Sequence, residues 1–476
     1  MNILSKTMKR MGVGLLAAAA LALGPACDSL DSTDLNNPSI EALTKNPTRS
    51  GILAASTGLV TGHRVQVAQT NGFVSLLGIL GRESYNFDKA DPRFISEMLE
   101  APSLDSSSPA FGGNEWQQPY QNIRNAFVVL GALDAVDPAA LTAVEKDTIK
   151  AFAKTIQALD FLVVHNTRWT NGGPIDVNRP LTEAPAPFKT KEEILAHVAT
   201  LLDDAAALLS PLDERFPFPL GNGFSGFNET TTFLQFNRGL RARVAVYQSD
   251  WPAAETALAA SFLNDTAPAT VTGLAVGVYH AYGTGSGDVV NNLVSPNILA
   301  NQKLVDDAEA GDLRVTRKLR RLLDSGGNPT TQTSRGLTTG YAFSIYPTNT
   351  TPIPILKNED LILLRAETRF RRGNTMGANQ DINLIRASAG LGTVPETTDE
   401  NTFITELLKQ RRYSLMFEGG HRWIDLRRLN RIGNPTGDAA IKDISTHNVH
   451  LAFPVPLAEC LARGPTDPSI QGKCLF

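Results

Sequence analysis

Apolar residues recur every three or four positions along much of the chain, and this spacing predicts a mainly α-helical fold. Residues 142–167, 191–209 and 231–247 follow the pattern, and residues 40–80 predict one or two further helices. The clearest stripe consists of Trp116, Tyr120, Ile123, Phe127 and Leu130. Because each helix carries one apolar face, we expect the helices to pack side by side around a shared core.

Two segments predict helical hairpins. Residues 240–258 place a Gln-Ser-Asp turn between two helices, with Pro252 in the first turn of the second helix. Residues 360–389 place a Gly-Asn turn between two helices. Such pairs resemble tetratricopeptide repeats, in which helix pairs stack on one another. The predicted fold class is mainly α, with tetratricopeptide-like helical pairs forming one large globular body.

The predicted loops contain the candidate positions for ligand binding. Between residues 268 and 354, Gly, Thr, Ser, Asn, Tyr and Pro dominate, which predicts long irregular loops with short strands. Long loops on a rigid body are where binding surfaces usually lie. Trp169 lies in a separate loop after the 142–167 helix, where its ring could stack on a sugar, although packing in the core is the preferred interpretation.

The first 26 residues look like a bacterial lipoprotein signal. Three basic residues precede an uncharged run from Met11 to Leu23, which is too short to span a bilayer. Small residues then lead to Cys27, so we expect Cys27 to be lipidated and residues 27–45 to form a flexible tether. A plain secreted protein with a chance cysteine at this position is the alternative.

Composition narrows the classes of function. The 44 basic and 48 acidic residues of the 476-residue chain give a net charge of −4. Without the first 26 residues, which hold three basic and no acidic residues, the balance is 41 against 48, or −7. A mildly acidic chain without basic runs argues against a nucleic-acid-binding protein. Three cysteines exclude a Cys-rich metal cluster, and in an exported protein Cys460 and Cys474 are expected to form a disulfide.

Motifs for catalysis and cofactors are weak. Residues 221–226 satisfy G-x-G-x-x-G, but no predicted strand precedes them and no helix follows at once. His447 and His450 are three apart in an extended stretch, which points them to opposite faces and argues against a zinc pair. Glu418 and Asp425 could be imagined as a glycosidase pair, but a helix cap and buried ion pairs with nearby arginines explain them better. Neither a cofactor, nor a metal ion, nor an enzymatic activity is predicted.

Several stretches carry a resemblance to a known family. Residues 403–428 form an Arg-rich helix that ends in Leu-Met-Phe-Glu-Gly and is followed by Arg-Trp and Asp-Leu-Arg-Arg. Together with the blocks at 358–367 and 382–391, this segment resembles the SusD/RagB family of outer-membrane nutrient-uptake lipoproteins. Members commonly have Glu where this chain has Gln410 and Ser414. Three shorter stretches match as well: residues 116–123, 173–175 and 453–456.

The resemblance implies a lipid-anchored α fold on the outer-membrane surface, facing the extracellular side. Such proteins cover a SusC-like TonB-dependent transporter and capture an oligosaccharide, or sometimes a peptide, without catalysis. The implied regions are a signal peptide (1–26), the tether (27–45), an N-terminal SusD-like region (46–265) and a C-terminal region with a loop-rich insertion (266–476). Glycan-contacting aromatics lie in variable loops of the family, and the candidates here are Tyr279, Tyr282, Tyr341 and Tyr346, although packing is the preferred interpretation of each.

Two other functions remain open at this stage. A secreted α-helical glycoside hydrolase would use Glu418 and Asp425, and a repeat scaffold would bind only protein. Glycan binding without turnover argues against the hydrolase, and a neighbouring gene for a SusC-like transporter argues against the scaffold. Arg422, Asp425, Arg427 and Arg428 are expected to form a partly buried structural network and not a ligand site.

Overall fold

The computed structural model describes residues 40–107, 109–180, 182–266, 271–432 and 447–474. The chain is mainly helical, as predicted, and its strands are short. Cys27 lies outside the described residues, and the end of the predicted tether, Ile40–Lys45, is helix α2. Within the described part of the chain, no helix is both long enough and apolar enough to cross a membrane.

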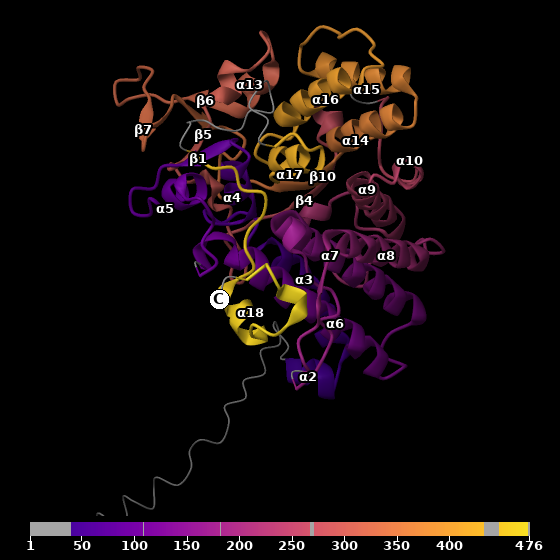
Figure 1. Cartoon of the computed structure of the whole chain (residues 1–476). Coiled ribbons are helices and arrows are strands. Elements are labelled where there is room, and N and C mark those ends of the chain that lie inside the picture. The colour runs from indigo at the N-terminus through magenta and orange to yellow at the C-terminus, as the bar shows by residue number, and fades with distance from the viewer. Residues whose placement is uncertain (1–39, 108, 181, 267–270, 433–446, 475–476) are drawn as a thin grey trace, which may run out of the picture.

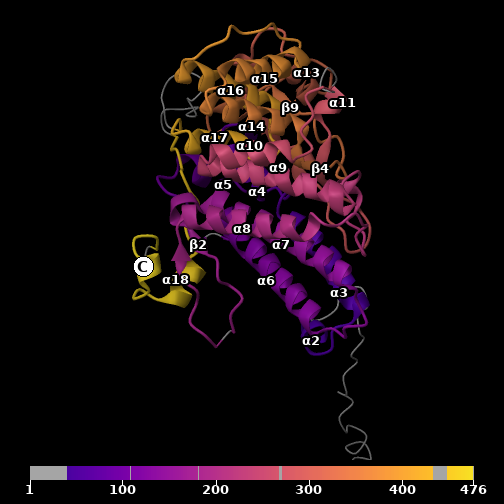
Figure 2. The same ribbon diagram turned by 90° about the vertical axis from the view of Figure 1, so that its right-hand side faces the viewer.

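The longer helices pack as pairs, and in three of the four pairs the two helices are neighbours in the order of helices along the chain (Figures 1 and 2). The pairs are α3 (Arg49–Arg64) with α6 (Asn114–Ala135), α7 (Ala143–Arg168) with α8 (Lys191–Leu209), α9 (Thr230–Gln248) with α10 (Trp251–Ala259), and α14 (Asn358–Arg371) with α15 (Thr375–Ser388). The hairpins predicted at 240–258 and 360–389 are the α9–α10 and α14–α15 pairs. The prediction of tetratricopeptide-like helical pairs is confirmed.

Side-chain caps fix where two of the long helices begin. The hydroxyl of Thr142 accepts a hydrogen bond from the Glu145 backbone N–H, and the Glu145 carboxylate accepts one from the Thr142 N–H. Thr190 and Glu193 repeat this reciprocal arrangement at the start of α8. Each of these capping boxes satisfies two backbone donors that a helix terminus would otherwise leave free. This explains why the predicted and observed first residues of the two helices agree so closely.

The segment from residue 40 to residue 80 contains three helices where one or two were expected: α2, α3 and α4 (Phe73–Leu80). Pro47 separates the first two, and a tight turn at Gly72 precedes the third. A Cβ on Gly72 would lie 2.0 Å from the carbonyl oxygen of Gln66, so this turn requires glycine. The remaining α-helices of the described residues are α5 (Arg93–Ile95), α11 (Val271–Leu274), α12 (Lys303–Asp306), α13 (Leu313–Lys318), α16 (Glu400–Ser414), α17 (His421–Arg428) and α18 (Leu457–Arg463).

Several short antiparallel strands lie in the region that was predicted to be loop with short strands. One four-stranded sheet has the order β1-β5-β9-β6, in which Leu299 of β5 pairs with both Tyr85 and Ala342. Its strands are β1 (Ser84–Asn86), β5 (Ile298–Ala300), β9 (Tyr341–Phe343) and β6 (Leu319–Arg321). The other pairs are β4 (Gly277–His280) with β10 (Ile353–Lys357), β2 (Gly173–Pro174) with β3 (Phe188–Lys189), and β7 (Gln332–Ser334) with β8 (Leu337–Thr339).

The C-terminal segment returns to the N-terminal helices. Figure 2 shows α18 beside β2, on the same side of α6 as the loop that joins β2 to β3. A small apolar cluster joins these parts, and it includes Trp116 of α6, Phe188 of β3 and Cys460 of α18. This return of the chain encloses the largest-volume cavity described below.

Candidate functional site

A cleft of about 900 Å³ opens beside α6. Four segments that are far apart in the sequence form its walls. They are residues 105–107 with 111–113, the N-terminal half of α6, the loop between β2 and β3, and residues 454–463. A cavity of this volume has the size of a typical small-molecule site, so the cleft is the first candidate for ligand binding.

Aromatic rings of α6 form the floor of the cleft. Trp116 and Tyr120 are four residues apart, so they lie on the same face of the helix, with ring centroids 4.7 Å apart. Phe188 stacks on Trp116 at 5.5 Å, and the Tyr120 hydroxyl donates a hydrogen bond of 2.9 Å to the carbonyl of Pro174. The rings are therefore held from behind by packing and by a hydrogen bond, which gives the floor a fixed shape.

A buried arginine supports this floor. The Arg168 guanidinium lies 5.4 Å from the Trp116 ring and 5.7 Å from the Phe453 ring, and it donates to the carbonyl of Gly112. Burial lowers the pKa of Arg168 to about 10. Gly112 has a φ of +92°, and a Cβ there would lie 2.4 Å from the Phe453 ring. The approach of the 111–113 segment to the C-terminal wall thus depends on glycine at this position.

Replacing Glu115 with glutamine is expected to stabilise the protein at alkaline pH. Glu115 of α6 is fully buried, and burial raises its pKa to about 7. A carboxyl whose pKa is higher in the folded than in the unfolded chain destabilises the folded protein only when it must ionise. This loss of unfolding free energy is absent well below the unfolded pKa and reaches its full size above the folded pKa. The neutral amide should therefore raise the free energy of unfolding by about 2–3 kcal/mol near pH 8.

Urea unfolding of both proteins near pH 8 and near pH 4.5 measures this difference. The gain from Glu115→Gln should shrink to less than about 0.5 kcal/mol at the lower pH, where the wild-type carboxyl is protonated in the folded protein and about half protonated in the unfolded chain. The exposed Glu255, whose side chain is 60% accessible, supplies the control, because Glu255→Gln should change little at either pH. An equal gain at both values of pH would contradict the assigned pKa.

Charged residues at the rim of the cleft are paired within its walls. Arg463 lies 2.6 Å from Glu459 and 3.1 Å from Asp467. Arg179 lies 3.3 Å from Asp176 in the opposite wall. The described lining includes three arginines and four acidic residues, so neither sign dominates. Such a surface favours a ligand without net charge.

A disulfide closes the C-terminal wall. Cys460 and Cys474 are joined, with their Cα atoms 5.8 Å apart, as the sequence analysis expects. The wall is also tied to the body of the protein through the backbone. The Phe453 N–H donates to the Thr167 carbonyl at 2.8 Å, and the Leu457 N–H donates to the Ser106 carbonyl at 3.0 Å.

The Arg-rich 403–428 segment forms α16, a turn and α17, and its charges lie inside the protein. Arg411 pairs with Asp360 at 2.8 Å and with Asp425 at 2.6 Å. Arg428 pairs with Asp425 at 2.8 Å and with Glu367 at 2.7 Å. Burial raises the pKa of Asp425, but Arg411 and Arg428 lower it more, and the result lies below the ordinary value. The expected structural network is confirmed for Asp425 and Arg428.

Two arginines of the expected network have different partners. Nε of Arg422 donates to the carbonyl of Gly81 at 3.0 Å. Arg427 donates to the carbonyls of Leu451 and Asn166 at 2.7 and 2.5 Å. Both residues therefore satisfy backbone carbonyls of segments that pack on α17.

Residues 340–449, which include this network segment, match the SusD family. The SusD/RagB resemblance is confirmed. No curated protein sequence matches the chain. Solved SusD-like structures share its fold, and three of them illustrate the agreement.

The first is a SusD superfamily protein from Bacteroides vulgatus, with 14% identity, a TM-score of 0.62, and coverage of 88% of this chain and 97% of that one. The second is surface glycan-binding protein A from Bacteroides thetaiotaomicron in complex with laminarihexaose, with 16% identity, a TM-score of 0.65 and coverage of 90% and 99%. The third is described as a laminarin-binding SusD-like protein, with 17% identity, a TM-score of 0.60 and coverage of 87% and 98%. At these identities the likeness establishes the SusD-like fold.

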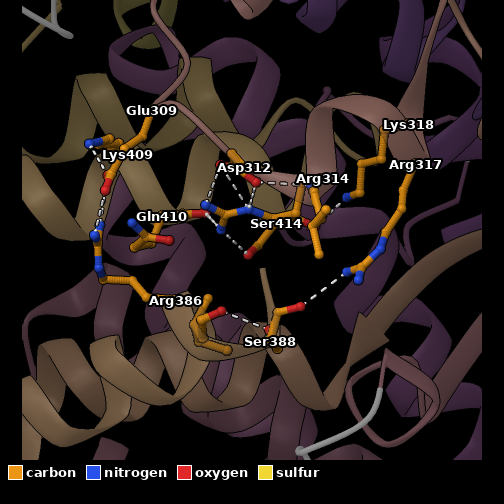
Figure 3. A network of polar contacts seen from close by, with 12 residues as sticks. Glu309, Asp312, Arg314, Arg317, Lys318, Arg386, Ser388, Lys409, Gln410 and Ser414 are labelled. Carbon is orange, nitrogen blue, oxygen red and sulfur yellow. Dashed lines mark hydrogen bonds and ion pairs between the residues drawn. The ribbon is translucent and has the colours of Figure 1, made fainter. Parts of the chain in front are cut away.

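Gln410 and Ser414, the two positions at which this chain departs from the SusD/RagB pattern, lie in a separate polar network (Figure 3). Ser414 accepts a hydrogen bond of 3.0 Å from Arg314, whose guanidinium also pairs with Asp312 at 2.7 Å. Gln410 donates to Glu406 at 2.7 Å. Arg314 therefore has its carboxylate partner in Asp312, and the side chains of Gln410 and Ser414 both have hydrogen-bond partners.

The expected partners of Glu418 were wrong. Its carboxylate lies 3.1 Å from Lys318 and 2.6 Å from Lys357, and no arginine pairs with it among the described residues. Lys318 ends α13 and Lys357 ends β10, so the fold brings them to Glu418 from 100 and 61 positions away. Burial raises the pKa of Glu418, but the two lysines outweigh it, and the pKa lies below the ordinary value.

Two of the loop tyrosines predicted to contact ligand lie in the core. Tyr282 is 8% exposed and Tyr346 is 7% exposed, and both belong to one apolar cluster with Phe417. The Tyr346 hydroxyl donates to the carbonyl of Phe417 at 2.7 Å. The short strands that precede these residues turn them inward, so a ligand contact through either ring is not available in this structure.

The other three candidates are half-buried. Trp169 lies between Lys191, 4.6 Å from its ring, and Arg427, 4.8 Å from its ring. The Tyr341 ring is covered by a guanidinium at 4.8 Å, and the Tyr279 hydroxyl donates to a backbone carbonyl. Among the described residues that line the cleft, none is one of the five candidates. A ligand role for these three stays a prediction.

Sequence reasoning missed the cleft because it assigned Trp116 to packing alone. A usable signal was present, however. The three short stretches that resemble the SusD/RagB family outside its main block, residues 116–123, 173–175 and 453–456, all contribute to the cleft lining. These three stretches, distant in the sequence, therefore lie around one cleft.

Proposed function

We propose that this protein is a non-catalytic binding protein of the outer-membrane surface. It captures a neutral oligosaccharide and delivers it to a SusC-like TonB-dependent transporter. The observation that carries this proposal is the SusD match at residues 340–449 on a chain whose whole fold resembles glycan-binding proteins. A short peptide is the second ligand class to test.

The cleft supports a neutral sugar as the ligand. Its floor offers the aromatic rings of Trp116 and Tyr120, its rim adds the exposed Gln117, and two of its three arginines already pair with acidic residues. Apolar and aromatic surface with a few polar groups is the usual composition of small-molecule sites. A neutral oligosaccharide can use both kinds of surface without breaking an ion pair.

The hydrolase alternative has little support from the candidate carboxylates. A glycosidase needs one carboxylic acid with a raised pKa and a second carboxylate across an open cleft. Glu418 and Asp425 instead both have lowered pKa values, and both are buried in ion pairs. Neither residue lines the cleft beside α6.

Replacing Cys27 with alanine should release the protein from the membrane fraction. The proposal includes a lipid on Cys27, which follows an uncharged signal-like run and precedes a polar segment. Immunoblots of carbonate-washed membranes and of soluble fractions measure the distribution. The double variant Cys460→Ala/Cys474→Ala serves as the control, because it replaces the other two cysteines together and should leave the protein on the membrane. Undiminished membrane association of Cys27→Ala would contradict lipid anchoring.

Co-purification tests the delivery step. The tagged wild-type protein is isolated in mild detergent from outer membranes of its own host, and its partners are identified by mass spectrometry. We expect a TonB-dependent transporter to be enriched relative to an equally tagged, unrelated surface lipoprotein. If no such transporter is enriched, the proposed partnership is wrong.

A further inference from the structure

A second cavity lies between α3 and α6, and its lining differs from that of the cleft. It is a groove of about 390 Å³. Its described lining consists only of Ala, Gly, Val, Thr, Asn and Gln residues. None of these carries a charge, although 19% of the residues in the chain do. The groove therefore presents hydroxyl and amide groups among small side chains.

Small residues of α3 leave this groove open. Ala54, Gly58 and Gly62 follow one another at intervals of four, so they share one face of the helix. A Cβ on Gly58 would meet no atom within 4 Å, whereas a Cβ on Gly62 would lie 2.2 Å from Oδ1 of Asn122. Gly58 thus leaves free space above the helix, and Gly62 leaves room for the Asn122 amide.

Asn122 lies at the floor of the groove, and its amide is held in one orientation. The residue is 2% exposed, and its Nδ2 donates to the Leu59 carbonyl at 3.0 Å and to Asp160 at 2.7 Å. A flipped amide would set Oδ1 against these two acceptors, so the orientation is fixed with Oδ1 toward Gly62. Among the described residues no group donates to this oxygen. Oδ1 is buried against Gly62, so the Asn122 amide holds α3 close to α6 and gives the floor of the groove a fixed shape.

Further amides stand along the same face of α6. Gln118, Gln121 and Asn125 are spaced by three and four residues, and all line the groove. Within the described chain, their side chains make no hydrogen bond to another residue. Each carboxamide offers two donors and an acceptor, and this mixed set matches hydroxyl groups, which both donate and accept.

We propose that the groove between α3 and α6 is a binding site for a neutral polyhydroxylated molecule of the size of a mono- or disaccharide. An ionic ligand would find no opposite charge in the lining, and burying its charge there would be unfavourable. A peptide would need a strand edge or a row of apolar pockets, which the lining lacks. The site is separate from the cleft, so this inference does not depend on the role proposed for the cleft.

Methyl NMR of the full-length mature protein tests the proposal. The probes are the neutral disaccharides cellobiose, laminaribiose and maltose, a glucuronate-containing disaccharide, and trialanine. We expect at least one neutral disaccharide to shift the methyl signals of Ala54 and Thr61, while the charged sugar and the peptide leave them unchanged. No shift with any neutral disaccharide, or equal shifts with the charged sugar or trialanine, would overturn the proposal.

Two variants of exposed helical glycines supply the matched pair. Gly58→Leu should fill the groove and weaken the disaccharide by about tenfold or more. Gly131→Leu makes the same change elsewhere on α6, where a Cβ also meets no atom within 4 Å, and should leave affinity unchanged. The double variant Gln121→Ala/Asn125→Ala, at exposed positions, provides a second test that preserves the helix packing. Equal affinity in wild type, Gly58→Leu and the double variant would place the ligand elsewhere and overturn the proposal.

Discussion

The Asp425→Ala variant is expected to lose about 3 kcal/mol of unfolding free energy, because two buried arginines lose a shared partner. Arg411 and Arg428 both pair with this carboxylate inside the protein, at 2.6 and 2.8 Å. Each keeps one other carboxylate, Asp360 or Glu367, so the loss should lie at the lower end of the range for broken buried pairs. Chemical denaturation of the purified variant measures it.

Ligand binding by the Asp425→Ala variant distinguishes a structural role of this network from a role in binding the ligand. Asp425 does not line the cleft, so the folded fraction of Asp425→Ala should bind oligosaccharide as wild type does. Asp203→Ala is the control, because Asp203 also pairs with two arginines, Arg238 and Arg241, but is half exposed. Its loss should cost about 1 kcal/mol or less. An Asp425→Ala protein with full stability and no ligand binding would move the binding site to α17.

The Ala458→Trp variant is expected to weaken oligosaccharide binding by more than about tenfold while leaving the fold stable. Ala458 is an exposed residue of α18 that lines the cleft. An indole at this position would project from a surface helix into the space beside the aromatic floor. No core contact is removed, so the melting temperature should change little.

The neighbouring Ala462 provides the control for this substitution. Ala462 is also exposed on α18, but it does not belong to the described cleft lining. Ala462→Trp should therefore bind as wild type does, and titration calorimetry compares the three proteins. If both variants bound equally well, the ligand would not occupy the cleft beside α6.

The helices were predictable because their apolar stripes and caps lie within short stretches of sequence. The expected helix at 191–209 is α8, and the helix expected at 142–167 is α7, one residue later at each end. In both, a threonine followed three residues later by glutamate fixes the start. The Arg-rich 403–428 segment was equally informative, because its alternation of charged and apolar residues describes a buried network.

The cleft was not predictable from local pattern, because its walls come from segments more than three hundred residues apart. Trp116 has the helical spacing of a core residue, and it does pack on Phe188, yet the same ring borders the cleft. Conversely, Tyr282 and Tyr346 lie in polar, Gly-rich sequence, but short strand pairs turn their rings into an apolar cluster. Tertiary contacts decide whether these side chains are exposed, and such contacts cannot be predicted from composition or from periodicity.

Titration of the purified mature protein with neutral hexasaccharides, followed by chromatography of the sugar, tests the central claim most directly. Laminarihexaose, cellohexaose and maltohexaose are the probes, and a hexapeptide without charged side chains is the comparison ligand. The account predicts saturable binding of at least one hexasaccharide, with the recovered sugar unchanged in length after long incubation. Shorter sugar products would show a hydrolase, and binding of the peptide but of no sugar would contradict neutral oligosaccharide capture.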